Sequence, residues 1–369
     1  MSEVPAGIVV SGTLQRQAWL DRVLPPVENV RPGLWSIPTP FPNSPLRYVL
    51  SYAIEYAGGV ALVDTGWPAE QAWDGLVSGL GQAGWDIDDV KAVLITHGHG
   101  DHMGLARRIR ERTGAWVAMH EADTGERNQY ESFAAFRRAS AEWLRKRGGQ
   151  ADDFRVIGQN DPAGQSDSPE LADFSLVPDR FLVDGERPLG PGTSLISVWT
   201  PGHTPGHVCF ADDVRDVVLT GDHILPRITP NISPAPHETG DMLGQYLGSL
   251  SALADRATAL HAAGEVLPAH EYRFIGLAER VQGLRLHHEA RLGEVMTGLR
   301  TAPGMTSVQV AEVLHWSRPW SQMLGIQRRF AIGEAYSHLF HLEHTGYITN
   351  KGIDVDDWHA LRETGPKLV

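Results

Sequence analysis

The pattern of hydrophobic and polar positions divides the first 120 residues into short apolar runs and segments with helical spacing. The apolar runs lie at 34–40, 48–56, 60–66, 90–96 and 115–120. Runs of this length, bounded by glycine or polar residues, are typical of buried or half-buried strands. Apolar residues recur at helical spacing over 70–81 and 105–113. Because strands that alternate with helices form α/β folds, this part of the chain predicts an α/β domain.

The pattern changes between residues 121 and 173. Residues 131–147 carry apolar side chains at helical spacing with basic residues between them, which predicts an amphipathic helix. Residues 158–169 are rich in glycine, aspartate, serine and proline, so they predict a loop. We interpret 121–173 as an insertion on the α/β domain. It would serve as a lid or substrate wall, or it would be a helical hairpin that only packs on the surface.

Strand signals return after this insertion, and helical signals dominate the C-terminal part. Strand-like runs that end near glycine, aspartate or histidine lie at 179–183, 194–199, 208–211, 217–219 and 265–267. Helical patterns follow at 278–299, 306–316 and 325–344. Thr306 and Gln309 have the spacing of a capping box, and Gly346 ends the last helix. Three helices and a terminal hairpin predict a winged-helix-like module over 276–369, which follows a separate domain over 1–275.

Length, net charge and cysteine content limit the classes of protein to which this chain could belong. A chain of 369 residues has room for two or three domains. Its net charge of −13 disfavours nucleic acid or an anionic membrane surface as the main partner. The single cysteine, Cys209, excludes an internal disulfide and a Cys-rich zinc module. The N-terminus has no basic signal-peptide region, and no apolar run reaches about 20 residues, so we expect a cytoplasmic protein.

The segment HGHGDH at residues 97–102 follows the apolar run at 90–96. Imidazole nitrogen and carboxylate oxygen are the ligands that zinc and similar divalent metals prefer. A turn from this strand into a helix, expected from about Met103, lets side chains that are close in sequence converge. Three histidines and one aspartate are more than one metal usually takes from a single loop. The cluster therefore predicts either two metals, or one metal surrounded by further polar side chains.

Further motifs stand where strand-like runs end: VDTG at 63–66, TPGHTPGH at 200–207, TGDH at 220–223 and PAHE at 268–271. Together with HGHGDH, and in this order, they resemble the metallo-β-lactamase-fold hydrolases over about residues 30–275. Asp222 indicates the glyoxalase II-like branch, because zinc β-lactamases commonly carry cysteine at that position. The segment SHLFHLEHTGYI near the C-terminus resembles the winged-helix tail of the branch that includes β-lactamase-like protein 2. The resemblance implies an αββα sandwich.

The resemblance also implies a role for each motif residue. One metal ion would be held by His97, His99 and His203, a second by Asp101, His102 and His270, with Asp222 bridging the two. Asp64 would orient the ligand loop through hydrogen bonds. Such a pair of cations activates a water molecule for attack on a carbonyl or phosphorus atom. Asp101 would orient the resulting hydroxide and handle its proton.

The leading hypothesis is a binuclear metal hydrolase that cleaves an ester, thioester or lactone of a small molecule. The nitrogen-rich ligand set favours zinc, with iron or manganese as alternatives. His237 and Arg227 follow Asp222 and are candidate substrate contacts, Arg227 for an anionic group. Two other functions remain open: a metal-dependent nuclease or phosphodiesterase, and a persulfide dioxygenase with one iron. We expect the helical tail to form a lid or a dimer contact in a homo-oligomer rather than a DNA-binding element.

Overall fold

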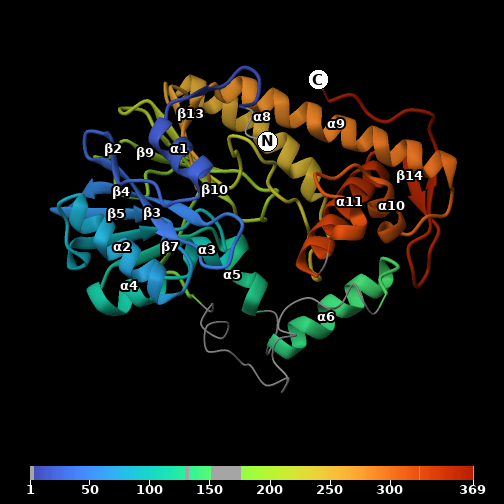
Figure 1. Ribbon diagram of the computed structural model, residues 1–369, viewed down its shortest axis with the longest axis horizontal. Coiled ribbons are helices and arrows are strands. Elements are labelled where there is room, and N and C mark those ends of the chain that lie inside the picture. Colours follow the sequence, from blue (N-terminus) through green and yellow to red (C-terminus); the bar gives the residue numbers. More distant parts are fainter. Residues whose placement is uncertain (1–3, 129–132, 151–175, 324, 369) are drawn as a thin grey trace. The chain divides into compact units, whose positions relative to one another are not determined.

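The computed structural model describes residues 4–128, 133–150, 176–323 and 325–368 (Figure 1). Contacts divide the chain into two compact units. The first unit holds residues 1–128, 173–230 and 248–281, and the second holds 129–172, 231–247 and 282–369. The predicted loop at 158–169 lies outside the described residues. The domain boundary at residue 275 and the insertion at 121–173 stay predictions. The division into two units by contacts does not test them.

The first unit contains a seven-stranded sheet whose strands follow one another in chain order. They are β2 (Glu28–Arg31), β3 (Leu34–Pro40), β4 (Tyr48–Tyr56), β5 (Gly59–Val63), β6 (Val90–Leu94), β7 (Trp116–Met119) and β8 (Arg180–Phe181). Strands β2 to β5 pair antiparallel, whereas β5 to β8 pair parallel. Helices connect β5 with β6 and β6 with β7, as parallel neighbours require.

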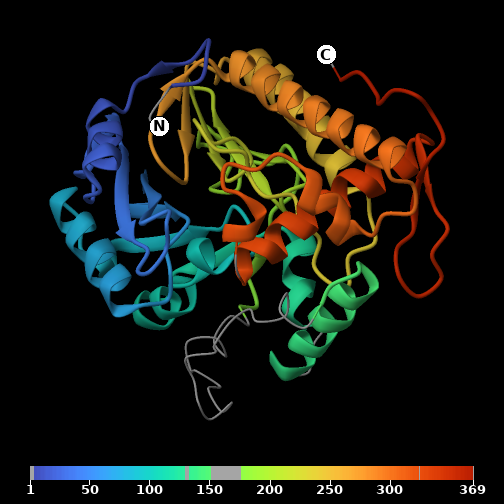
Figure 2. The ribbon, with the colours of Figure 1, turned by 45° about the vertical axis from the view of Figure 1, so that its right-hand side comes forward.

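A six-stranded sheet in the same unit has the order β1-β13-β12-β11-β10-β9. Its strands are β1 (Val9–Val10), β9 (Leu195–Trp199), β10 (Val208–Asp212), β11 (Val217–Gly221), β12 (Glu265–Pro268) and β13 (Phe274–Ile275). Because β10 is antiparallel to both β9 and β11, and β12 is parallel to β11, strands β9, β11 and β12 run in one direction. Figure 2 shows this sheet, yellow-green to orange, beside the blue to teal strands of the first.

Helices of the first unit include predicted and unpredicted elements. They are α1 (Thr13–Asp21), α2 (Glu70–Gln82), the 3-10 turn η1 (Ile87–Asp89), α3 (Gly100–Met103), α4 (Ala106–Thr113), α5 (Glu121–Asn128) and, from residue 248 on, α8 (Met242–Ala259). The predictions for 70–81 and 105–113 are confirmed by α2 and α4. Helices α1 and α8 were not predicted, and α8 contains Gly244 and Gly248, which weaken a helical signal.

Apolar side chains pack on both faces of the seven-stranded sheet. Successive residues of a strand point to opposite faces. Val63 of β5 belongs to one core cluster together with Phe210 and other residues of the six-stranded sheet. Its neighbour Leu62 belongs to a second core cluster together with Leu76 of α2. Figure 1 shows α2 and α4 on one side of the sheet. The predicted α/β sandwich of two sheets is therefore confirmed.

The strand ends of the two sheets carry the motifs that the sequence singled out. Parallel strands end at the same edge of a sheet, which is where ligands usually bind in α/β folds. The segments at these strand ends are 64–66 after β5, 95–102 after β6, 120–123 after β7, 200–207 after β9, 222–223 after β11 and 269–271 after β12. Because these strands run in the same direction within each sheet, residues that are far apart in the sequence follow strand ends at the same edge of that sheet.

The second unit is mainly helical in its described part. Its elements are α6 (Phe133–Lys146), α9 (Leu277–Thr301, from residue 282), α10 (Ser307–Val313), the 3-10 turn η3 (Trp320–Gln322), α11 (Ile326–His344), β14 (Ile348–Asn350) and β15 (Trp358–Ala360). Thr306 and Gln309 form the predicted capping box before α10. The predicted C-terminal helices and the terminal hairpin are confirmed. The winged-helix assignment of this module stays a prediction.

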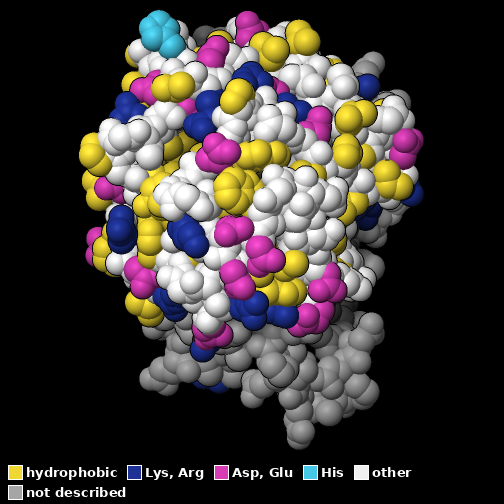
Figure 3. Space-filling model, turned by 90° about the vertical axis from the view of Figure 1, so that its left-hand side faces the viewer, with side chains coloured by type: hydrophobic (Ala, Val, Ile, Leu, Met, Phe, Trp, Pro, Cys, Tyr) yellow, Lys and Arg dark blue, Asp and Glu magenta, His cyan; other side chains and the backbone are white. Residues whose placement is uncertain are grey.

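Acidic and basic side chains are interspersed with hydrophobic ones over the described part of the face drawn in Figure 3. Mixed charges of this kind are ordinary for a protein surface. No helix within the described ranges is long and apolar enough to cross a membrane. The expected cellular location and the expected partners stay predictions.

Candidate metal centre

The loop after β6 carries HGHGDH on a turn into a one-turn helix. His99 has an extended backbone, with φ −74° and ψ 148°, and α3 begins at the next residue, Gly100. The helix expected from about Met103 therefore starts earlier, so that Asp101 and His102 lie on it. Thr65 holds the turn in place, because its backbone N–H and its hydroxyl donate to the carbonyl of His102 at 2.7 and 2.9 Å.

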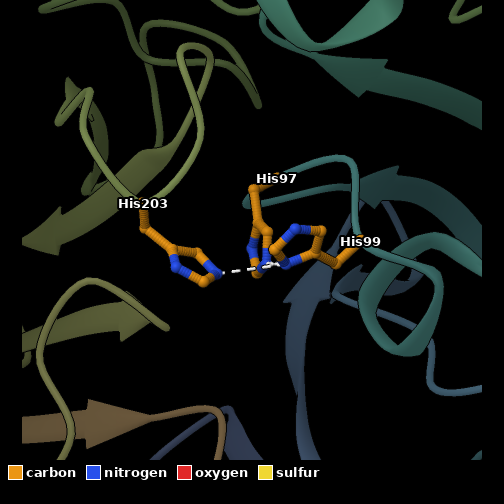
Figure 4. Close-up of side chains that lie close together, drawn as sticks. All are labelled: His97, His99 and His203. Carbon is orange, nitrogen blue, oxygen red and sulfur yellow. Dashed lines mark hydrogen bonds between the residues drawn. The ribbon is translucent and has the colours of Figure 1, made fainter. Parts of the chain in front are cut away.

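Three imidazole rings from two loops point toward one another in a first group (Figure 4). His97 Nε2 lies 2.9 Å from His99 Nδ1, and His203 Nε2 lies 3.1 Å from the same atom. Nitrogen ligands of a tetrahedral zinc ion, about 2.0 Å from the metal, are themselves about 3.3 Å apart. The three side chains can therefore hold a metal ion.

Hydrogen bonds on the outer side of the His97 and His270 rings determine which nitrogen of each ring faces the candidate metal centre. The Thr96 hydroxyl donates to Asp64 Oδ2, so it can only accept from His97 Nδ1, 3.0 Å away. His270 Nδ1 lies 3.0 Å from the carbonyl oxygen of Tyr48, which also can only accept. Each ring is thus protonated at Nδ1 when neutral, and its Nε2 lone pair is available to a metal.

A second group combines carboxylates and imidazoles. His270 Nε2 lies 3.4 Å from Asp101 Oδ2, and His102 Nε2 lies 3.7 Å from the same oxygen. Both Nε2 atoms are buried and have no hydrogen-bond partner in the described part of the chain. Buried polar atoms are normally paired, so two such atoms that face one point are suited to a bound cation. Asp101, His102 and His270 can hold a metal ion.

Asp222 faces both groups with different oxygens. Its Oδ1 lies 3.3 Å from His270 Nε2 and 3.6 Å from His102 Nε2. Its Oδ2 lies 3.7 Å from His203 Nε2, which belongs to the first group. The backbone N–H of Asp222 donates to Nε2 of the buried His207 at 3.2 Å, which holds the residue in position. The carboxylate therefore lies between the two groups of ligands.

Asp64 accepts hydrogen bonds from the loop that carries HGHGDH and contacts one of its histidines. Its carboxylate accepts from the Thr96 N–H at 2.8 Å and from the Thr96 hydroxyl at 2.9 Å. His102 Nδ1 lies 2.8 Å from Asp64 Oδ2, so this ring also turns Nε2 toward the centre. Asp64 has a φ of 59°, a left-handed backbone that is rare for a non-glycine residue. Its three contacts compensate for this strained conformation.

Asp123 is a residue of the site that the sequence did not single out. Its buried carboxylate accepts from the Gly98 N–H at 2.8 Å, from the Thr204 hydroxyl at 2.7 Å and from the Gly206 N–H at 2.5 Å. It thereby ties the loop of His97 to the loop of His203. The available signal was its position shortly after β7, whose parallel neighbour β6 ends in the HGHGDH loop.

The pKa values of the histidines differ between the two groups. Burial and neighbouring imidazoles lower the pKa of His97 well below its ordinary value and that of His99 to about 3. Burial also acts to lower the pKa of His102 and His270, but nearby carboxylates outweigh it. They raise the pKa of His102 well above its ordinary value and that of His270 to about 10. In the metal-free protein at neutral pH, His102 and His270 are therefore cationic, whereas His97 and His99 are neutral.

The two candidate substrate contacts lie in different units. Arg227, in the first unit, donates to Glu271 Oε1 at 2.5 Å, and Glu271 directly follows His270. His237 lies half-buried in the second unit and belongs to no metal-capable group found among the described residues. Substrate binding by either residue stays a prediction.

Comparisons with known proteins agree with the fold described above. A family profile described as Metallo-beta-lactamase superfamily matches residues 44–270. The chain is also similar to the crystal structure of a metallo-beta-lactamase family protein from Thermus thermophilus. The two are 29% identical with a TM-score of 0.71, over 90% of this chain and 99% of that chain.

Relatives identified by sequence match a shorter part of the chain. The lactamase-like protein adaB of Aspergillus niger is 29% identical over 146 residues, which are 38% of this chain and 42% of that protein. The hydroxyacylglutathione hydrolase GloC of Haemophilus influenzae is 28% identical over 164 residues, 44% of this chain and 59% of that protein. The chain thus spans about half the length of these curated relatives.

Proposed function

The chain belongs to the metallo-β-lactamase superfamily, and on this basis we propose that it is a hydrolase with two divalent metal ions. Its substrate in this proposal is an ester, thioester or lactone of a small molecule. Asp222 and the partial similarity to a hydroxyacylglutathione hydrolase support the glyoxalase II-like branch, and with it a thioester. Zinc is the metal that the nitrogen-rich ligands favour, with iron and manganese as alternatives.

The observation that carries the proposal is the two-sided position of Asp222. One of its oxygens lies within 3.6 Å of two imidazoles, and the other lies 3.7 Å from an imidazole of the other group. A carboxylate that only formed an ion pair would need no second group of nitrogens on its other side. His97, His99 and His203 would hold one ion, Asp101, His102 and His270 the other, and Asp222 would contact both.

The chemistry follows from the charges of these residues. Metal ions, when bound, lower the pKa of water and polarise a carbonyl. Burial raises the pKa of Asp101, but the charges of His102 and His270 outweigh it and lower that pKa to about 2. In the metal-free protein its carboxylate is therefore ionised at neutral pH. With metal bound, it would orient a water molecule and handle its proton. Asp64 and Tyr48 keep the imidazoles in the orientation that this requires.

Metal analysis combined with an activity panel tests the proposal. Purified protein should contain about two divalent ions per chain. It should hydrolyse at least one class among thioesters, lactones and aryl esters, and chelation should abolish this activity. One iron per chain with oxygen consumption on a persulfide would reject the hydrolase in favour of a dioxygenase. Cleavage of single-stranded RNA, lost in Asp101→Ala, would favour the nuclease instead.

The pH dependence of metal binding is a second expected result. Because His102 and His270 carry protons in the metal-free protein, metal binding to their group should release them. Affinity at this group should fall as pH falls below about 10, by about 10-fold per pH unit for each displaced proton. Calorimetry in buffers of different ionisation enthalpy measures the release directly.

The first group provides the internal comparison for this experiment. His97 and His99 are neutral at neutral pH, with an Nε2 or Nδ1 lone pair already available, so an ion bound there should release few protons. In His203→Ala, which weakens the first group, the remaining binding heat should depend on the buffer. Binding heats that are the same in every buffer for both ions would contradict the prediction.

A further inference from the structure

A pocket of the first unit is lined by Tyr272, which lies two residues after His270 of the metal centre. Its volume is about 330 Å³. It is lined by Arg16, Trp19, Leu20, Arg22, Arg47, Arg227 and Tyr272. We propose that this pocket binds the phosphate groups of an organic phosphate, as the anionic part of the substrate. This inference rests on the proposed hydrolase function and names a feature of its substrate.

The charge of the pocket is the first argument. Four of its seven lining residues are arginines, and none of the described lining residues is acidic. This concentration occurs in a chain with a net charge of −13. Guanidinium groups bind phosphate through pairs of parallel hydrogen bonds, and they are enriched where phosphate is recognised. A purely structural role would not require several arginines around one cavity.

The second argument is that two of the arginines are already held in place. Arg47 donates to the carbonyl oxygen of Trp19 at 2.6 Å, and its guanidinium lies 4.0 Å from the centre of the Trp19 ring. Arg227 lies 5.7 Å from the same ring and is fixed by Glu271 at 2.5 Å. Side chains that are ordered before binding lose less conformational entropy when a ligand arrives.

The third argument is the connection to the metal centre. Tyr272 lines the pocket and lies two residues after His270, so the two Cα atoms are at most about 7 Å apart. Arg227 lies five residues after Asp222 on the segment that leaves β11. One ligand could therefore place an anionic group in the pocket and a scissile bond at the metal centre.

The volume and the charge of the pocket indicate which anion it can bind. Glu271 already pairs with Arg227. A single carboxylate would neutralise only one of the other three guanidinium groups, whereas a pyrophosphate carries several charges. A volume of about 330 Å³ lies at the lower end of the range for small-molecule sites. The pocket therefore suits a phosphate or pyrophosphate group of a small molecule rather than a nucleic acid strand.

Binding of inorganic pyrophosphate, measured by calorimetry, tests the pocket directly. Arg16→Gln and the double variant Arg16→Gln/Arg47→Gln should weaken binding by about 10-fold and at least about 100-fold, since each removes a charge-assisted hydrogen bond. Arg108→Gln is the matched control, because Arg108 is an exposed arginine of the same unit that pairs with Glu70. Equal binding by the wild type and the double variant would overturn the proposal, and so would the absence of any binding.

Kinetics with two acyl thioesters that differ only in the presence of phosphate groups tests the link to the substrate. For the phosphorylated thioester, Arg16→Gln should raise KM about 10-fold with little change in kcat. For the other thioester, neither constant should change, which also verifies that the variant is folded. An Arg16→Gln variant with unchanged KM for both would overturn the substrate role. Pyrophosphate binding without hydrolysis of any ester would instead reject the proposed hydrolase and support the pocket.

Discussion

Replacement of Asp222 by alanine is expected to lower kcat/KM by at least about 1,000-fold. The carboxylate faces both ligand groups, so its loss removes the shared contact and the negative charge between them. The loss of several kcal/mol of charge stabilisation corresponds to this factor. The backbone N–H that donates to His207 remains, so the strand end should keep its shape. Metal content, measured by mass spectrometry, should fall from about two ions per chain to one or none.

The control for this experiment is Asp213→Ala, which removes a half-buried aspartate of the same unit that pairs with Arg187. It should leave metal content and turnover near the wild-type values. Asp222→Asn keeps the size of the side chain and removes its charge, so it should also lose metal. An Asp222→Ala protein that retained two ions and most of its activity would contradict the bridging role.

Replacement of Asp123 by alanine is expected to destabilise the fold and the metal centre together. The buried carboxylate accepts hydrogen bonds from Gly98, Thr204 and Gly206. Its removal leaves these donors without their acceptor, and hydrogen bonds to charged groups contribute about 1.5–3 kcal/mol each. Because the effects are not additive, we expect a loss of about 3–5 kcal/mol, measured by denaturant unfolding of the metal-free protein.

The two ligand loops that Asp123 connects should also lose their relative position. Metal affinity is therefore expected to fall about 10–100-fold, as is usual when a partner that supports metal ligands is removed. Glu121→Ala, at an exposed position of the same helix, is the control and should change neither stability nor metal binding. If Asp123→Ala unfolded like the control and bound metal like the wild type, the proposed connection between the loops would be wrong.

The motifs of the candidate metal centre could be recognised from local patterns, whereas the role of each residue was implied by the resemblance. HGHGDH, TPGHTPGH, TGDH and PAHE each follow a strand that hydrophobic periodicity identified, and these strands are β6, β9, β11 and β12. The capping box at Thr306 is equally local, because its two partners are three residues apart. Such features depend on short stretches of chain, in which spacing alone determines which side chains can meet.

Other parts of the site could not be predicted from local sequence patterns. Asp123 carries no motif of its own, and its partners Thr204 and Gly206 lie 81 and 83 residues away. The arginine pocket combines residues 16–22 and 47 with 227 and 272, and no spacing in the sequence connects them. The sequence alone therefore determined most of the strands, though not β1, β2 and β13, and it placed histidine and aspartate at their ends, because both follow from local patterns. The role of each ligand came from the resemblance to the metallo-β-lactamase-fold hydrolases. Only the tertiary structure decided which imidazole nitrogens face the centre, which carboxylate connects the loops and where four arginines meet, because these depend on the path of the chain between distant segments.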